Sequence, residues 1–283
     1  MYDFLYTTKQ YLLTILKKFA SQRSSSIETM SIKKTQFSEK LFNLREYFFP
    51  SGCGGCGEAL LSNEEAYLGL CASCRAMFES FYGDEKHCAY CGKALISEKD
   101  LCLSCRRNGA IENGRYSTQL VKLRSLFPYS GKYSSVLGSY KFGKSLGVGN
   151  FLSRFLVLAA DNLKIDNLDF TKKTAWVPVP PRPGKMKKQG WDQIEYLTKI
   201  LEERGPLSVC RCLKRLPSRS QKELNRMERG INLKGRIKCI NQPPETAIVF
   251  DDVITTGATI NECAEVLLNA GCKKVYAICL FYD

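Results

Sequence analysis

The residue types and spacings in this chain suggest two kinds of chemistry, and the first is metal binding by cysteine. Eight of the fourteen cysteines form Cys-x-x-Cys pairs. The pairs are Cys53/Cys56, Cys71/Cys74, Cys88/Cys91 and Cys102/Cys105. Each pair can hold two thiolates on one zinc ion, and two pairs complete a closed tetrahedral site. We therefore expect about two structural zinc ions per chain, with neighbouring pairs sharing an ion, although an interleaved pairing stays open.

The length of these cysteine units also favours a structural metal. Each half of the region spans about 20 residues, well below the roughly 40 at which a chain usually folds without a metal, a disulfide or a partner. A redox role for the pairs is the weaker alternative, because the thioredoxin-like βαβ context is missing. The sequence thus predicts a small zinc-stabilised domain.

The second kind of chemistry is recognition of a phosphorylated sugar in the segment 247–259. Residues 248–250 are apolar and β-forming, and apolar residues recur at helical spacing from Ile260 to Ala270 before Gly271 ends the helix, so the loop joins a strand to a helix. Such a loop offers backbone N–H groups to an anion, and small hydroxylated residues add donors. The loop residues are Thr255, Thr256, Gly257, Ala258 and Thr259. Asp251 and Asp252 would repel phosphate but accept hydrogen bonds from sugar hydroxyls. The segment therefore predicts a ribose 5-phosphate site, against the plainer reading of an ordinary strand, turn and helix.

This segment resembles the signature of the type I phosphoribosyltransferases, which is a strand, two acids and a threonine-rich 5-phosphate loop. The resemblance implies phosphoribosyl pyrophosphate as the ligand, together with magnesium. It also implies an α/β fold in which a mostly parallel sheet is flanked by helices, with Asp251 and Asp252 as the catalytic acids.

Two basic segments could hold the pyrophosphate. The loop that follows the apolar residues 174–179 carries Arg182 and Lys185, and cations of this kind bind phosphate oxygens. Arg215 and Arg219 begin the second basic segment, which could close over the pyrophosphate as a flap. The alternatives are a solvated basic turn and a solvated charged helix.

Composition sets the wider limits. The chain has 283 residues, 44% of them hydrophobic, and a formal net charge of +14, which favours polyanionic ligands. It has no apolar run long enough to span a membrane and no convincing signal peptide, so we expect a cytoplasmic protein. The expected organisation is an extension and linker over residues 1–36, a double zinc ribbon over 37–107 and a phosphoribosyltransferase domain over 108–283.

From about Phe37 onwards the chain resembles the ComF family of competence-associated, phosphoribosyltransferase-like proteins. Besides the two features above, the resemblance rests on Tyr140-Lys141-Phe142-Gly143, Val177-Pro178-Val179-Pro180, Gly190-Trp191-Asp192-Gln193 and the segment from Arg215 to Gly235. The family more usually has Phe-Asn-Gln where this chain has Trp191-Asp192-Gln193.

This resemblance implies a role in DNA uptake during natural transformation, with DNA-uptake proteins as partners and an unknown acceptor substrate. Whether the protein turns over as an enzyme stays open. The main alternative is a non-catalytic competence protein that binds single-stranded DNA and keeps the phosphoribosyl site. A purine-sensing regulator is a weaker alternative, since no helix-turn-helix is evident.

Overall fold

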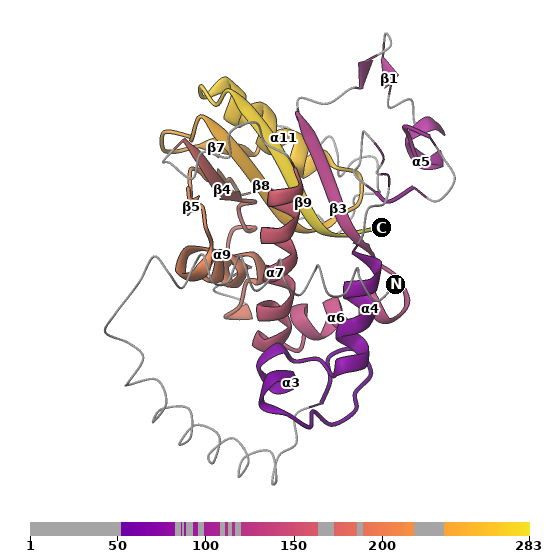
Figure 1. The fold of residues 1–283 in the computed structure, drawn as a ribbon. Coiled ribbons are helices and arrows are strands. Elements are labelled where there is room, and N and C mark those ends of the chain that lie inside the picture. Colours follow the sequence, from indigo (N-terminus) through magenta and orange to yellow (C-terminus); the bar gives the residue numbers. More distant parts are fainter. Residues whose placement is uncertain are drawn as a thin grey trace, which may run out of the picture. The chain divides into compact units, whose positions relative to one another are not determined.

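A five-stranded parallel sheet organises the α/β part of the chain (Figure 1). The computed structural model describes residues 52–82, 86, 88, 93–95, 99–107, 111–112, 115–116, 120–163, 173–185, 189–217 and 235–283. In spatial order the strands are β3 (Lys122–Pro128), β9 (Lys274–Tyr282), β8 (Thr246–Ile254), β4 (Thr174–Pro178) and β5 (Ser208–Val209). All four pairings between neighbours are parallel.

Helices cover both faces of this sheet. On one face a hydrophobic core joins sheet residues such as Trp176 and Phe250 to three helices, which are α6 (Gly131–Lys141), α7 (Leu146–Asn162) and α9 (Gln193–Arg204). On the other face α11 (Ala258–Asn269) packs against sheet residues such as Val249 and Ala277. The central strands are apolar on both sides for this reason. The predicted α/β class, a mostly parallel sheet flanked by helices, is confirmed.

The sheet has a topological switch point between β4 and β8. These strands are neighbours, but β4 continues through α9 to β5 on one side, while β8 continues through α11 to β9 on the other. Connections that leave in opposite directions open a crevice beyond the carboxyl ends of the two strands, which is where open α/β sheets bind ligands. The predicted phosphate loop and the basic loop after β4 both begin there.

A short antiparallel pair lies outside the main sheet. It consists of β6 (Leu213–Arg215) and β7 (Ile237–Cys239). The pair brings together the two ends of the predicted flap, and the backbone N–H of Leu216 donates to the carbonyl oxygen of Arg236 at 2.7 Å. The carboxylate of Glu262 on α11 accepts from the backbone N–H groups of Arg236 and Ile237. Residues 218–234, which include Arg219, lie outside the described residues.

The N-terminal part carries short elements around the cysteines. They are α3 (Asn63–Leu68), α4 (Ala72–Phe81), α5 (Leu103–Arg107) and the antiparallel pair β1 (Ile111–Glu112) and β2 (Arg115–Tyr116). The first cysteine cluster belongs to the same hydrophobic core as α7 and the sheet. Phe78 of α4 is fully buried there and packs edge-on to Phe127 with ring centroids 4.6 Å apart.

The second cysteine cluster has a small core of its own. It contains Cys88, Leu95, Leu101, Cys102 and Cys105. The predicted extension over residues 1–36 lies outside the described residues, and the predicted boundaries at 36/37 and 107/108 stay predictions. No helix in the described ranges is long and apolar enough to cross a membrane.

Candidate functional site

The first cysteine cluster has the geometry of a tetrathiolate zinc site. The sulfur atoms of Cys53, Cys56, Cys71 and Cys74 all lie within 4.8 Å of one another, and those of Cys56 and Cys71 are 3.7 Å apart. A tetrahedron with zinc–sulfur bonds of about 2.3 Å has edges of roughly 3.8 Å. The residues therefore fit zinc, which would stabilise the fold here and leave no open coordination position.

Backbone amides prepare this cluster for a metal. The N–H groups of Gly55 and Cys71 donate to the sulfur of Cys53 at 3.4 and 3.3 Å. Burial raises the pKa of the Cys53 thiol, but backbone hydrogen bonds outweigh burial and lower it to about 7. Burial and hydrogen bonds from neighbouring thiols raise the pKa of Cys74. A cation at the centre would favour the thiolate form of all four residues.

The second cluster has the same character. The sulfurs of Cys88, Cys102 and Cys105 lie within 4.8 Å of one another, whereas Cys91 lies outside the described residues. The pairs Cys53/Cys56 and Cys71/Cys74 therefore come together, and Cys88 lies with the pair Cys102/Cys105, as the preferred pairing predicts. The clusters support structural zinc in both halves of the ribbon.

The loop at the carboxyl end of β8 presents the start of a long helix. Gly257 caps α11 with a left-handed backbone, φ 75°, which favours glycine because it has no Cβ. Thr255 and Thr256 are exposed, and residues 257–259 are half-buried. The first turn of α11 carries no acidic residue. This arrangement suits an anion, and it brings together all five residues of the predicted phosphate loop.

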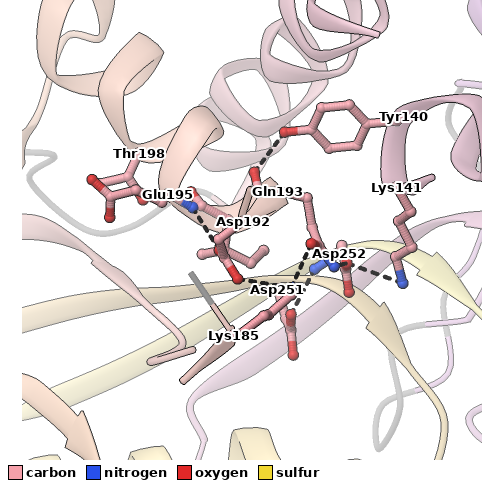
Figure 2. Close-up of polar contacts among 10 residues, drawn as sticks. Tyr140, Lys141, Lys185, Asp192, Gln193, Glu195, Thr198, Asp251 and Asp252 are labelled. Carbon is pink, nitrogen blue, oxygen red and sulfur yellow. Dashed lines mark hydrogen bonds and ion pairs between the residues drawn. The ribbon is translucent and has the colours of Figure 1, made fainter. Parts of the chain in front are cut away.

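The two acids lie in the last part of β8, and they have different neighbours. Asp252 is buried, and its Oδ2 contacts both the ammonium of Lys141 at 3.0 Å and Nε2 of Gln193 at 2.6 Å (Figure 2). Asp251 is half-buried, and its Oδ1 accepts from the backbone N–H of Asp252. Burial and the negative charge of Asp252 raise the pKa of Asp251 well above its ordinary value. The site thus holds one salt-bridged carboxylate and one carboxyl group that resists ionisation.

The basic loop after β4 is tied to the start of α9. Lys185 forms an ion pair with Asp192 at 2.7 Å and donates to Oε1 of Gln193 at 2.5 Å (Figure 2). Asp192 also caps α9, because its Oδ1 accepts from the backbone N–H of Glu195 at 2.9 Å. The residue that departs from the usual ComF pattern therefore has a local structural role here.

The charges of Arg182 and Asp251 both act on Arg215. Burial, and then the charge of Arg182, lower the pKa of Arg215, while Asp251 acts in the opposite direction. Arg182 is exposed and Arg215 is half-buried. Of the four predicted pyrophosphate residues, Lys185 is thus paired internally, Arg182 and Arg215 interact electrostatically, and Arg219 lies outside the described residues.

Comparison with known proteins agrees with this picture. The double zinc ribbon domain family matches residues 44–109. Competence protein ComFC of Streptococcus pneumoniae is 29% identical over 221 residues, which is 76% of this chain and 88% of that protein. Competence protein F of Haemophilus influenzae is 25% identical over 213 residues, 73% of this chain and 87% of that protein. The chain is therefore a homologue of these competence proteins. The DNA utilization protein YhgH of Escherichia coli K12 is also similar, 26% identical over 226 residues, which cover 75% and 96% of the two chains.

The structure adds two residues to the site that the sequence had placed only in ComF motifs, without a role. Lys141 ends α6 and Gln193 begins α9, and both side chains meet Asp252. Tyr140 fixes the same junction, because its hydroxyl donates to the backbone oxygen of Gln193 at 2.5 Å. The signal that could have found them is their place in the Tyr-Lys-Phe-Gly and Trp-Asp-Gln motifs.

Proposed function

We propose that this ComF homologue binds phosphoribosyl pyrophosphate with magnesium in the crevice beyond β4 and β8, and that it acts in DNA uptake in the cytoplasm. The observation that carries the binding proposal is the pairing of two features at one switch point. The glycine-capped start of α11 suits a phosphate, and Asp251 and Asp252 beside it suit hydroxyl groups. The relatives are competence and DNA utilization proteins, which supports the role in uptake.

Each part of the ligand has a complementary set of groups. Residues 255–259 would take the 5-phosphate, and Asp251 and Asp252 would take the ribose hydroxyls. Arg182 and Arg215 would face the pyrophosphate. Lys185 could join them by exchanging Asp192 for a phosphate oxygen, and Arg219 stays a prediction for the same group.

The magnesium ion is assigned chiefly to the ligand. Mg²⁺ prefers oxygen ligands and is commonly held through substrate phosphates and water, with one or two carboxylates. Burial and the charge of Asp252 raise the pKa of Asp251, which disfavours the ionised form that would bind the ion. When bound, the ion would neutralise charge on the pyrophosphate.

Transfer of the ribosyl group would require little covalent chemistry from the chain. Pyrophosphate would leave the anomeric carbon through a cationic transition state. The carboxylate of Asp252 would add negative potential near the developing cation, and the arginines would stabilise the departing anion. No acceptor pocket follows from the described residues, so ligand binding is the function we propose and turnover is its extension.

Titration calorimetry with phosphoribosyl pyrophosphate and magnesium tests the proposal. We expect saturable binding of about one ligand per chain, lost in the double variant Asp251→Ala/Asp252→Ala. The matched control is Glu202→Ala/Glu203→Ala, which removes two adjacent negative charges from the far end of α9. Unchanged affinity in the first variant, with the fold intact, would refute the ribose assignment.

Single-stranded DNA is the second candidate ligand, and the net charge of +14 together with the names of the relatives favours it. Binding through phosphate contacts would weaken steeply with salt, because each contact releases counterions. A fluorescence anisotropy titration of a labelled oligonucleotide at several salt concentrations measures this slope. Absence of binding at low salt would remove this candidate.

A further inference from the structure

We propose that Lys141 and Gln193 are positioning residues that orient Asp252 toward the ribose hydroxyls of the ligand. The inference rests on the proposed function and assigns a role to side chains from two elements that are distant in sequence. Lys141 is the last residue of α6 and Gln193 is the first residue of α9. Figure 2 shows both side chains directed at the carboxylate of Asp252 on β8.

Both donors act on the same carboxylate oxygen. The ammonium of Lys141 lies 3.0 Å and Nε2 of Gln193 lies 2.6 Å from Oδ2 of Asp252. Two donors on one oxygen restrict the rotation of the carboxylate. The side chains of Lys141 and Asp252 are only 21% and 9% exposed, so water competes weakly for these contacts. A ligand hydroxyl would therefore meet an acceptor that is already oriented.

Gln193 is itself held in one orientation. Lys185 donates to Oε1, and this contact turns Nε2 toward the carboxylate. The buried hydroxyl of Tyr140 donates to the backbone oxygen of Gln193 and ties the end of α6 to the start of α9. A site whose orienting groups are held by further contacts is preorganised for its ligand.

The charge arrangement argues for a role beyond packing. A largely buried ion pair is weak evidence for stability, because desolvation of the two charges offsets much of their attraction. Apolar side chains could close α6 on α9 without this cost. The ion pair of Lys141 with Asp252 is instead explained if it keeps the carboxylate of Asp252 in a fixed orientation at the crevice.

The test compares two probes that share a phosphate monoester but differ in hydroxyls, ribose 5-phosphate and methyl phosphate. We expect Gln193→Leu and Lys141→Met to weaken ribose 5-phosphate binding about tenfold, while methyl phosphate affinity stays within about twofold. Matched controls are Gln189→Leu and Lys144→Met, which change an exposed amide and an exposed cation nearby and should alter neither affinity. Thermal unfolding of every variant checks that the fold is kept, and Gln193→Leu retains the ion pair if Lys141→Met proves unstable.

The outcomes separate this inference from the proposed function. Loss of ribose 5-phosphate affinity alone supports the positioning role. Equal weakening of both probes, or no change in either, overturns it while the binding function stands. If the unaltered protein binds methyl phosphate but gains nothing from the ribose hydroxyls, the ribose assignment itself fails, and the positioning role fails with it.

Discussion

Loss of the first zinc site should unfold much more of the protein than loss of the second. The contrast can be made with Cys74→Ser and Cys102→Ser, which each remove one buried sulfur ligand. Cys74 lies in α4, one turn before Phe78, in the core that also contains α7 and the sheet. Cys102 lies in the small separate core of the second cluster.

The size of the difference follows from the apolar side chains around the first cluster. Leu68, Leu70 and Phe78 are each 0% exposed in the shared core. Burial of each is worth about 1.5–3 kcal/mol, so release of all three removes roughly 5–9 kcal/mol. For a unit of this size 1 kcal/mol shifts the melting temperature by about 2–4 °C. We therefore expect Cys74→Ser to lower the melting temperature of the α/β part by at least about 10 °C, and Cys102→Ser to change it by no more than about 2 °C.

Tryptophan fluorescence is the suitable assay, because the chain has only two tryptophans and both lie in the α/β part. Trp176 is in β4 and fully buried, and Trp191 precedes α9. Elemental analysis of the same samples should show about one zinc fewer per chain in each variant. Equal melting shifts in the two variants, with equal zinc loss, would refute the reasoning that the first cluster shares its core with the sheet.

Three further predictions concern the crevice. Burial and Asp252 raise the pKa of Asp251, so its protonated form stabilises the fold at low pH and this contribution is lost as the pH rises. Asp251→Asn should therefore raise the melting temperature, and the gain should not shrink between about pH 6 and about pH 8. A lower melting temperature in this variant would contradict the raised pKa. Gly257→Ala should cost about 1 kcal/mol in denaturant unfolding and weaken methyl phosphate binding, whereas Gly271→Ala, also at positive φ, should cost a similar amount and leave binding unchanged. Asp192→Asn should preserve the cap of α9 and change the stability by no more than about 1 kcal/mol. It should also release Lys185 from its ion pair and so strengthen pyrophosphate binding. Unchanged affinity in titration calorimetry would show that Lys185 does not reach the ligand.

Much of the fold could be predicted because the signals are local. The apolar run at 248–250 and the helical spacing after Ile260 predict a strand, a loop and a helix, and the structure has β8 and α11 there. The Cys-x-x-Cys spacing predicts two zinc sites, and the described cysteines form two clusters. In these segments the spacing of apolar residues along the chain predicts the helix or strand, and the spacing of the cysteines predicts the metal site.

The contacts within the crevice could not be predicted in the same way. Lys141 and Asp252 are brought together by the packing of α6 against the sheet. Neither sequence motif on its own indicates that these two residues form an ion pair. The pairing of Lys185 with Asp192 likewise depends on how the loop after β4 returns to α9. The pyrophosphate assignment treated Lys185 as an open cation, whereas the structure shows it neutralised by its neighbour. The exchange of Asp192 for a ligand phosphate at Lys185 stays a prediction.

The antiparallel pair of β6 and β7 has a consequence for how this protein can diversify. The hydrogen bond from the N–H of Leu216 to the oxygen of Arg236 closes the chain at the base of residues 218–234, and Glu262 anchors the same base to α11. The entropy of closing a loop grows only slowly with its length. Insertions, deletions and exchanges between these strands would therefore cost the sheet little. The fold therefore places few demands on this stretch, and a requirement for particular residues in it would come from function.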